Sequence, residues 1–370
     1  MEYREYKDGI KLSRLGMGNM RLPVKADVEG RPIDYEKAKA IIDRAYKMGV
    51  NYYDTAYIYH GGESEVFTGR ALAEYPRDSY YVADKYNLDA EPDYTKQFPE
   101  QLRRLNLDRI DFYLLHGVMD HNVDTFAGNG CFDYFDRMKA EGKIRYFGFS
   151  FHGTPAALRR MVAMREWDFV QIQLNYYDWF FGNAKELYDI LDEAGIPIMV
   201  MEPVRGGLLA KLNDAGAAVL KNAAPEKSLA SWALRWVKEL ERVQVVLSGM
   251  TEMEQMNDNL ATFADETKLT EAEHAVIREG ALKLRDSVAV PCTGCRYCTD
   301  GCPMALDIPR MMLMYNEAKL GGAWRLSGLN DLAEDKLPAA CIACGTCTGV
   351  CPQSIDIPGY MQKLAEMMKK

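Results

Sequence analysis

Long apolar runs are missing from this chain. No window approaches the roughly 20 consecutive apolar residues that a membrane-spanning helix needs. Residues 1–20 scatter charges where a signal peptide would have a continuous apolar core. These absences exclude a membrane protein and predict a cytoplasmic one.

A surplus of basic residues is missing as well. The chain has 45 Lys and Arg against 54 Asp and Glu, which gives a formal net charge of −9. Proteins that bind a phosphate backbone need a basic surface. We therefore expect no nucleic-acid partner.

Cysteine is scarce in most of the chain and abundant at its end. The first 290 residues contain one, Cys131, which we interpret as a buried structural thiol. The last eighty residues contain the other eight. In a reducing compartment such a cluster indicates metal ligation rather than disulfides.

The eight cysteines form two copies of one motif, C-x2-C-x2-C-x3-C-P, and the copies lie 49 residues apart. The match continues through "LDIP" at 306–309 and "IDIP" at 355–358. This is the spacing of bacterial ferredoxins, in which the fourth cysteine ligates the second 4Fe-4S cluster. Zinc is the alternative, but zinc sites more often use separated C-x2-C pairs. The motif therefore predicts two 4Fe-4S clusters held by Cys292, Cys295, Cys298, Cys302, Cys341, Cys344, Cys347 and Cys351.

Eight short apolar runs recur at fairly even spacing before residue 250, with helical periodicity between them. They are LGMGNM from 15, NYYDTA from 51, YYVADK from 80, IDFYLLH from 110, IRYFGFS from 144, FVQIQLN from 169, IPIMVME from 196 and VQVVLSG from 243. Strands and helices that alternate eight times predict an α/β fold, a closed (β/α)8 TIM barrel. The alternative is an open doubly wound sheet, but no G-x-G-x-x-G follows a strand.

One helix between these runs is well marked. Asp34 is a suitable N-cap, Ala38, Ile41, Ile42, Ala45 and Met48 share one face, and Gly49 ends the helix. A further helix over 267–287 leads into the first cysteine run. We therefore place a domain boundary near 285, with the barrel over 1–284 and a small, mainly helical 4Fe-4S ferredoxin-like domain over 285–370.

Four polar residues mark the carboxyl ends of consecutive strands, where TIM-barrel enzymes place their chemistry. Asp54, Lys85 and His116 end the second, third and fourth runs, and Tyr59 follows Asp54 by five residues. Each also has a purely structural interpretation. Asp54 could cap a helix, Tyr59 could pack in the core, Lys85 could be a solvated strand end, and His116 could be a core histidine. Together, at three consecutive strand ends, they favour a catalytic site.

The segments that carry these residues, "DTAYIYHGGESE", "VADK" and "DFYLLH", resemble the aldo-keto reductase family, as do "GFS", "VQIQLN" and "NDNL". The resemblance implies that Tyr59 is the general acid, that Lys85 and Asp54 lower its pKa, and that His116 orients the substrate carbonyl. The physics agrees, because an ammonium beside a phenol favours the phenolate. The family uses NADP(H) or NAD(H).

The same resemblance assigns cofactor contacts. It implies that Ser150 and Gln171 hold the nicotinamide carboxamide and that Asn259 contacts the adenine. Arg205, before Gly206 and Gly207, either clamps a pyrophosphate or lies in a surface turn, and both interpretations stay open.

Other positions depart from the family pattern. Phe151 stands where an asparagine usually follows the serine, and Met201 stands where a tyrosine usually stacks on the nicotinamide. Gly249 and Gln255 lie near the positions of the basic residues that grip the 2′-phosphate. These departures weaken the case for NADPH, and the missing tyrosine leaves room for another ring system such as a flavin.

The tail resembles a two-cluster ferredoxin of the helical type. That resemblance implies that the first three cysteines of each copy share a cluster with the last cysteine of the other copy. One cluster then has Cys292, Cys295, Cys298 and Cys351, and the other has Cys341, Cys344, Cys347 and Cys302.

These parts predict an aldo-keto reductase-type oxidoreductase that reduces a carbonyl or oxidises an alcohol, with two clusters for electron transfer or docking. One alternative is a redox relay, possibly flavin-mediated and with a redox partner protein, that performs no carbonyl chemistry. Another is a non-catalytic redox-sensing subunit. Substrate selectivity is expected in the loops at 117–130 and 175–183, whose aromatic residues either line a pocket or pack against the ferredoxin domain.

Overall fold

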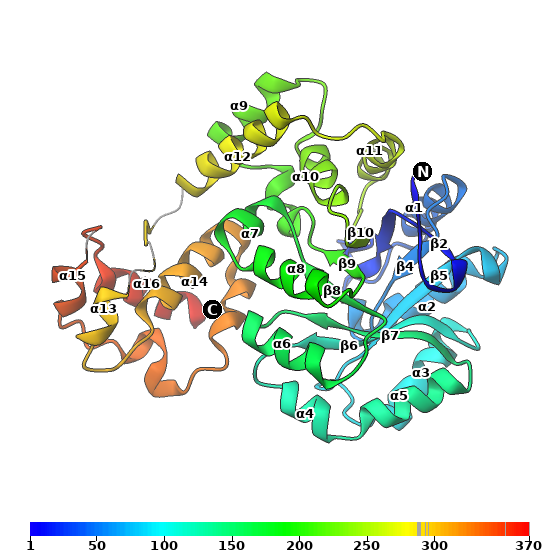
Figure 1. Ribbon diagram of the computed structural model, residues 1–370, viewed down its shortest axis with the longest axis horizontal. Helices are drawn as coiled ribbons and strands as arrows, with labels where there is room; N and C mark the ends of the chain where they lie inside the picture. Colours follow the sequence, from blue (N-terminus) through cyan, green and yellow to red (C-terminus); the bar gives the residue numbers. More distant parts are fainter. Residues whose placement is uncertain (287–289, 293, 295, 352, 370) are drawn as a thin grey trace. The chain divides into compact units, whose positions relative to one another are not determined.

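Eight parallel strands close into a barrel in the computed structural model, which describes residues 1–286, 290–292, 294, 296–351 and 353–369. Their order around the barrel is β10-β3-β4-β5-β6-β7-β8-β9 (Figure 1). Each of the eight apolar runs overlaps one strand, so the predicted (β/α)8 fold is confirmed. The strands are β3 Leu15–Gly18, β4 Tyr52–Asp54, β5 Tyr81–Tyr86, β6 Ile110–Val118, β7 Ile144–Phe151, β8 Phe169–Gln173, β9 Ile198–Met201 and β10 Val243–Ser248.

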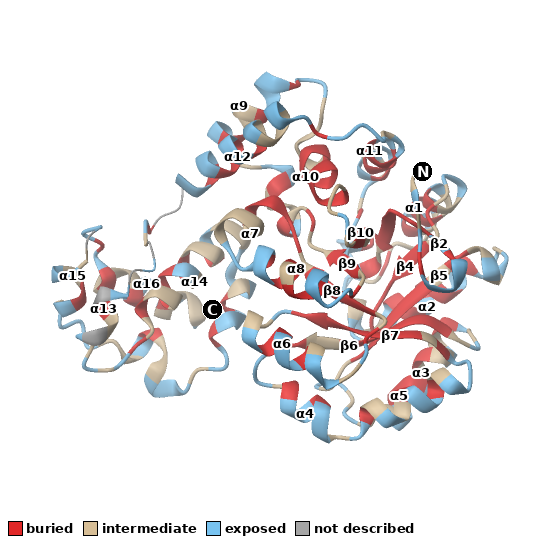
Figure 2. Cartoon of the chain, in the orientation of Figure 1, coloured by how far each residue is buried: buried red, intermediate tan, exposed pale blue. Residues whose placement is uncertain are grey.

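The barrel strands are buried almost throughout, because helices cover their outer face and side chains fill the inside (Figure 2). Tyr52, Phe112, Tyr146 and Phe169 belong to one buried interior cluster, which also contains Met199. The sequences of these strands are therefore continuous apolar runs, without the alternation of apolar and polar residues that a strand with one exposed face has.

A hairpin that the sequence pattern did not predict adds to this interior. Strand β1 (Tyr3–Glu5) pairs antiparallel with β2 (Lys11–Ser13). Tyr6, Ile10 and Leu12 join the interior cluster, and the Tyr6 ring lies 5.6 Å from that of Phe112. Strands of three residues are too short to show a periodicity, which is why the pattern missed them.

Helix α1 (Tyr35–Lys47) starts as predicted, with the Asp34 carboxylate accepting a hydrogen bond from the backbone N–H of Lys37. Four of the five residues predicted for its inner face are buried, but Met48 is exposed. Met48 is the C-cap, and the chain turns away there as Gly49 adopts a φ of +93°. The prediction for Met48 was therefore wrong.

The other helices lie between the barrel strands or after the last of them, β10. They are α2 Glu63–Leu72, α3 Tyr94–Leu105, α4 Val123–Gly128, α5 Cys131–Ala140, α6 Pro155–Met164, α7 Tyr176–Phe181, α8 Ala184–Glu193, α9 Asp214–Ala223, α10 Leu229–Lys238, α11 Met253–Ala264, α12 Glu271–Asp286, α13 Tyr297–Asp300, α14 Ile308–Gly321, α15 Thr346–Gly349 and α16 Ile357–Met368. Within the described residues, none of these helices has the length and apolar character that crossing a membrane would need.

The chain forms two compact units. The first comprises Met1–Val204 and Leu220–Arg278, and the second comprises Arg205–Val219 and Glu279–Lys370. The cysteine-bearing part of the second unit is mainly helical, as predicted, and has its own core, which includes Leu306, Met311, Tyr315 and Met361.

The sequence repeat is also a structural repeat. A short helix, α13 or α15, begins within each cysteine run, and a longer helix, α14 or α16, begins at the isoleucine of each "DIP". Backbone conformation repeats too: Gly294 and Ala343 both have positive φ, as do Arg296 and Gly345. The 49-residue offset therefore relates two copies of one fold.

Candidate functional site

The four predicted catalytic residues come from three adjacent strands and the turn after one of them. Asp54 is the last residue of β4, Lys85 lies in β5 and His116 in β6, while Tyr59 begins the short 3-10 helix η3 (Tyr59–Gly62). Strands β4, β5 and β6 are neighbours in the barrel. Their carboxyl ends therefore meet at one rim, and the structure brings all four side chains together there.

Lys85 and Asp54 form a buried ion pair. The Lys85 Nζ donates to both carboxylate oxygens of Asp54, at 2.8 Å each, and also to the carbonyl of Thr55. Burial raises the pKa of Asp54, and the Lys85 ammonium opposes that shift. Burial is the largest single influence on the pKa of Lys85 and lowers it, but the charges of Asp54 and Tyr59 and the hydrogen bond to Asp54 together outweigh burial and raise that pKa. Lys85 therefore stays an ammonium.

Tyr59 lies against this ammonium. The Nζ of Lys85 is 5.0 Å from the centroid of the Tyr59 ring. Burial raises the pKa of Tyr59 above its ordinary value, the charge of Lys85 lowers it, and the charge of Asp54 raises it again. Lys85 thus acts in the predicted direction, whereas Asp54 acts in the opposite direction to the one predicted, and the expectation of a net lowered pKa was wrong. Burial is the larger effect, and it keeps the phenol protonated and able to donate.

His116 faces Tyr59, with ring centroids 5.9 Å apart and an interplanar angle of 83°. Burial lowers its pKa well below the ordinary value, and the charge of Lys85 adds to the shift. The amide nitrogen of Asn87 lies 3.3 Å from His116 Nδ1. Because an amide nitrogen can only donate, Nδ1 accepts and the proton of the neutral ring is on Nε2. His116 can therefore donate one hydrogen bond from Nε2.

The predicted cofactor residues Ser150, Gln171 and Met201 lie in β7, β8 and β9. Gln171 is 2% exposed, and its Nε2 lies 3.7 Å from the sulfur of Met201. Its Oε1 is buried and has no hydrogen-bond partner among the described residues. A carboxamide group that donates through its NH2 would satisfy this oxygen, so Gln171 fits a nicotinamide. Ser150 Oγ already accepts from the N–H of Gly117 at 2.8 Å.

Three further positions have partners of their own. Asn259, in α11, is 4% exposed and donates to Ser248 Oγ at 3.0 Å. Gln255 Oε1 accepts from the N–H groups of Thr251 and Glu252 at 2.8 and 3.1 Å, and so caps α11. Phe151 is buried against Phe149.

Arg205 belongs to the second unit and begins the 3-10 helix η5 (Arg205–Ala210). It is 3% exposed and forms an ion pair with Glu317 of α14, which also pairs with Arg325. The Arg205 side chain is therefore buried, while Gly206 beside it is exposed and both Gly206 and Gly207 have positive φ.

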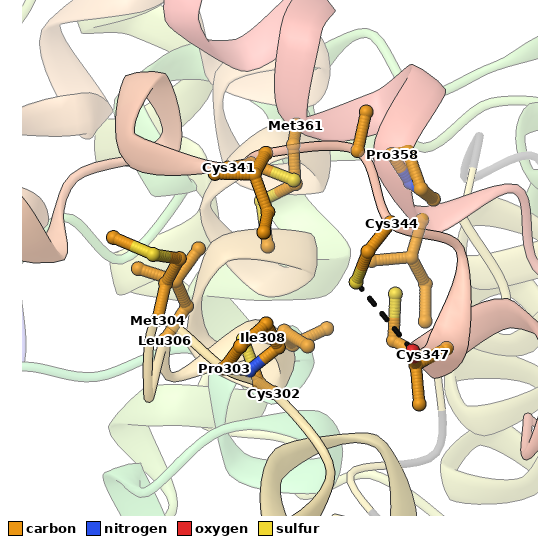
Figure 3. Close-up of a pocket in the computed structure, with 14 residues that line it drawn as sticks. Cys302, Pro303, Met304, Leu306, Ile308, Cys341, Cys344, Cys347, Pro358 and Met361 are labelled. Atoms are coloured by element: carbon orange, nitrogen blue, oxygen red, sulfur yellow. Dashed lines mark hydrogen bonds between the residues drawn. The ribbon is translucent and has the colours of Figure 1, made fainter.

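The cysteines gather around two pockets of the second unit, each with an empty volume of ≈ 350 Å³ that includes its open mouth. Figure 3 shows the first pocket, lined by Cys302, Cys341, Cys344 and Cys347. The Sγ of Cys344 lies 3.5 Å from Thr346 Oγ1, and this contact lowers the pKa of its thiol. Four cysteine sulfurs enclosed by apolar side chains form a soft donor set, which fits an iron–sulfur cluster.

The second pocket is lined by Cys292, Cys298 and Cys351. The predicted fourth ligand, Cys295, lies outside the described residues, as does Pro352. Cys292 and Cys298 come from the first copy of the motif and Cys351 from the second, whereas Cys302 joins the second copy's first three cysteines. The fold therefore crosses the last cysteine of each copy to the other pocket.

Cys131 lies apart from both pockets, in α5. It is fully buried, and burial raises the pKa of its thiol to about 12. A thiol in such surroundings is inert.

The aromatic stretch predicted to control selectivity packs largely within its own unit. Tyr176 and Tyr177 are buried, and the rings of Tyr176, Trp179 and Phe180 lie 5.3–6.5 Å from that of Trp236 in α10. These contacts are core packing around α10.

Several residues beside Lys85 were missed by sequence reasoning. Asp84, Glu65 and Gln101 are buried polar side chains, each 0% exposed. Asp84 belongs to the motif "VADK" and Glu65 to "GGESE". Their separation in the sequence, however, does not predict that the two side chains are neighbours. Asn87, which fixes the proton of His116, follows Lys85 by two residues.

Two family models match the chain. The Aldo/keto reductase family model matches residues 14–281, and the 4Fe-4S dicluster domain model matches residues 291–356. The first match covers more than half of the chain, so the protein belongs to the aldo/keto reductase family. It is an oxidoreductase of that type with a C-terminal 4Fe-4S dicluster domain. The match to the dicluster model favours iron–sulfur clusters over the zinc alternative for the cysteine motifs.

The curated relatives resemble the barrel part. YqkF, an uncharacterized oxidoreductase of Bacillus subtilis, is 26% identical over 297 residues, which are 71% of this chain and 91% of the relative. The NADH-specific methylglyoxal reductase of Escherichia coli is 26% identical over 323 residues, 74% of this chain and 95% of that enzyme.

Solved structures agree with the fold. An aldo-keto reductase of Bacillus halodurans in its holo form has a TM-score of 0.63 and 26% identity, and the match covers 76% of this chain and 96% of that one. An aldo-keto reductase of Klebsiella pneumoniae in complex with NADPH has a TM-score of 0.61 at 20% identity, over 75% of this chain and 94% of that one. At 20% identity the second likeness concerns the fold alone.

Proposed function

We propose that the barrel reduces a small carbonyl compound with a nicotinamide dinucleotide, or oxidises the corresponding alcohol, and that Tyr59 is its general acid. The observation that carries this proposal is the Lys85 ammonium, which donates two 2.8 Å hydrogen bonds to Asp54 and lies against the Tyr59 ring. A structural lysine has no need of a phenol and a neutral imidazole beside it. A carbonyl that becomes an alkoxide needs both a proton donor and a hydrogen-bond donor.

Each of the four residues has a role in this chemistry. The nicotinamide supplies hydride to the carbonyl carbon when it is bound. Tyr59 gives its hydroxyl proton to the developing alkoxide, and the Lys85 ammonium stabilises the phenolate that remains. Asp54 holds that ammonium charged and in place. His116 donates from Nε2 and orients the carbonyl oxygen.

We further propose that the preferred cofactor is NADH. Gln255 is engaged in capping α11, and the start of that helix has acidic residues, Glu252 and Glu254. A 2′-phosphate near these carboxylates would meet repulsion instead of charge-assisted hydrogen bonds. The Escherichia coli relative is named as NADH-specific. One cation, Arg21, does lie over Gly249, whose added Cβ would be 3.1 Å from the Arg21 Cβ.

The cofactor preference is tested by kcat/KM for NADH and NADPH at low salt, in the parent protein and in Arg21→Gln. We expect NADH to be preferred by at least about tenfold, the equivalent of about 1.4 kcal/mol. A preference for NADPH that disappears in Arg21→Gln would overturn the proposal and show that Arg21 replaces the missing cations.

The catalytic proposal is tested with Tyr59→Phe. The anaerobically purified variant should lose about 10²–10⁴-fold in kcat for NADH-dependent reduction of methylglyoxal, while it keeps its iron and its visible spectrum. Tyr35→Phe makes the same substitution in α1, where the ring packs on Phe67, and should keep parent activity. A fully active Tyr59→Phe would refute the assignment.

The same preparation tests whether the clusters join the reaction. We propose that the clusters serve electron transfer or docking and that hydride transfer to the carbonyl bypasses them. NADH added without substrate should therefore leave the cluster absorbance unchanged. Bleaching of that absorbance would show that electrons pass from nicotinamide to the clusters, as in the relay interpretation.

The ligand assignment is tested with paired cysteine variants. We propose that Cys302 shares a cluster with Cys341, Cys344 and Cys347, while Cys292, Cys295, Cys298 and Cys351 hold the other. Cys302→Ser with Cys341→Ser should then disturb one cluster and leave half of the iron. Cys302→Ser with Cys292→Ser should disturb both. Equal iron loss in the two double variants would refute the crossed assignment.

A further inference from the structure

A set of buried polar side chains lies behind Lys85, outside the barrel interior. Asp84 precedes Lys85 in β5, and successive side chains of a strand point to opposite faces. Lys85 meets Asp54 on one side, so Asp84 faces the helices, where it meets Glu65 of α2. Both carboxyl groups are 0% exposed. Neither takes part in the proposed proton transfer.

The backbone of Lys85 depends on this set. The register between β4 and β5 ends at the pair Asp54 and Ala83. Beyond it, the N–H of Lys85 donates to Asp84 Oδ1 at 2.8 Å, and its carbonyl accepts from Gln101 Nε2 at 3.0 Å. Two side chains therefore hold both backbone polar groups of Lys85.

The carboxyl groups of Asp84 and Glu65 interact, and Gln101 Nε2 donates both to Glu65 Oε1 at 3.1 Å and to the Lys85 carbonyl at 3.0 Å. Asp84 Oδ2 is buried and has no hydrogen-bond partner in the described part of the chain. Two carboxylates are acceptors only, so a hydrogen bond between the two groups, which would satisfy Asp84 Oδ2, requires one of them to hold a proton. Two neighbouring buried carboxyls do not both ionise readily.

The donors decide which carboxyl is the acid. Glu65 accepts from Gln101 Nε2 at 3.1 Å and from the Arg104 guanidinium at 2.8 Å, so each of its oxygens already has a donor. Asp84 has the single backbone donor of Lys85. Burial and the charge of Glu65 raise the pKa of Asp84 well above its ordinary value.

Arg104 extends the set to the loop that carries Tyr59. Its guanidinium lies 4.3 Å from the centroid of the Tyr57 ring and also pairs with Glu100 at 2.8 Å. An added Cβ on Gly62 would be 3.1 Å from its Nη1. Other charged and titratable groups surround Asp84 and Glu65. The strands β4 and β5 contribute Asp54 and Lys85, η3 contributes Tyr59, and α3 contributes Arg104 and Glu100. Strand β6 contributes Tyr113, whose hydroxyl donates to Gln101 Oε1 at 2.5 Å.

We propose that Asp84 and Glu65 share one proton, held on Asp84, and that this acid–carboxylate pair is a positioning element that fixes Lys85 and the loop of Tyr59. The positioning role rests on the proposed function, because it presupposes that Lys85 and Tyr59 are the catalytic pair. The shared proton does not depend on the proposed function, so a separate experiment measures it.

Infrared difference spectroscopy tests the proton without any substrate. The spectrum of the parent protein minus that of Asp84→Asn should contain the carbonyl stretch of a protonated carboxylic acid at neutral pH. Asp111 is the matched control: it is equally buried, but it accepts from Arg77 and from the N–H of Val82, so Asp111→Asn should remove no such band. A difference spectrum of Asp84→Asn without the band would overturn the proposal.

Kinetics test the positioning role. Asparagine reproduces the neutral acid, since it accepts from Lys85 and donates to Glu65, so Asp84→Asn should keep kcat and the alkaline limb of the pH profile. Asp84→Ala removes both contacts and should lower kcat by about 10–100-fold with little change in KM. If Asp84 were ionised, Asp84→Asn would remove a charge that raises the pKa of Tyr59, and the alkaline limb would move to lower pH. That shift would overturn the proposal, and so would an Asp84→Ala variant with parent kcat.

The two proposals fail separately. A fully active Tyr59→Phe would refute the catalytic assignment and leave the infrared band in place. A missing band with an inactive Tyr59→Phe would refute the shared proton alone.

Discussion

Replacing Lys85 by methionine isolates what the buried ion pair contributes. The side chains of Lys85 and Asp54 are 1% and 5% exposed, and two 2.8 Å hydrogen bonds join them. Methionine keeps most of the volume and removes the charge, so Asp54 is left buried without its cation. Breaking such a pair typically costs about 3–5 kcal/mol, a large part of a total of about 5–15 kcal/mol.

The loss should depend on pH in a definite direction. Burial raises the pKa of Asp54 even beside Lys85, and without the ammonium nothing opposes that shift. An acid whose folded-state pKa is raised contributes stability below its unfolded-state pKa and loses it as pH rises through the folded-state pKa. The deficit of Lys85→Met should therefore grow as pH rises, by at most about 1.4 kcal/mol per pH unit.

Urea unfolding under anaerobic conditions at several pH values measures this deficit. Tryptophan fluorescence reports on the barrel, because four of the five tryptophans, all but Trp324, belong to the first unit. The double variant Lys85→Met with Asp54→Asn is the control, since it removes the stranded charge and should show a smaller deficit without this pH dependence. Both variants should be inactive. A pH-independent deficit in Lys85→Met, equal to that of the double variant, would refute the reasoning.

Two other predictions follow from the geometry of the first unit. Gly69→Ala should destabilise the barrel by about 1–3 kcal/mol, because its Cβ would lie 2.2 Å from the backbone oxygen of Leu105 and force α2 away from α3. Gly128→Ala, whose Cβ meets no described residue within 4 Å, should stay near parent stability in the same thermal unfolding assay, and an equal loss in both would contradict the steric argument. His116 has a pKa well below its ordinary value, so it stays neutral as pH falls through about 6.5, where an ordinary histidine gains its proton. The acid limb of kcat/KM should lie below that pH, and an inflection near 6.5 that disappears in His116→Gln would refute the assignment.

Patterns that are local in the sequence were sufficient for much of this protein. Strand positions could be predicted because a strand buried on both faces is typically an apolar run of a few residues, and eight such runs that alternate with helices are typical of a closed barrel. The cysteine motif could be recognised because three ligands of one cluster lie on one loop, where spacing alone sets their reach. Asp54, Lys85 and His116 stood out because a polar residue at the end of an apolar strand is visible without knowing its neighbours.

Properties that depend on distant residues needed the tertiary structure. Glu317, the partner of Arg205, lies more than a hundred residues away in the chain, and no spacing relates Asp84 to Glu65. The net pKa shift of Tyr59 was mispredicted because burial, which outweighs the charge of Lys85, is a property of the assembled barrel. The sequence by itself determined the elements and the kinds of ligand. Which side chains meet, and how far water is excluded from them, was decided only when the strands closed and the helices packed around them, because distance and burial belong to the folded chain.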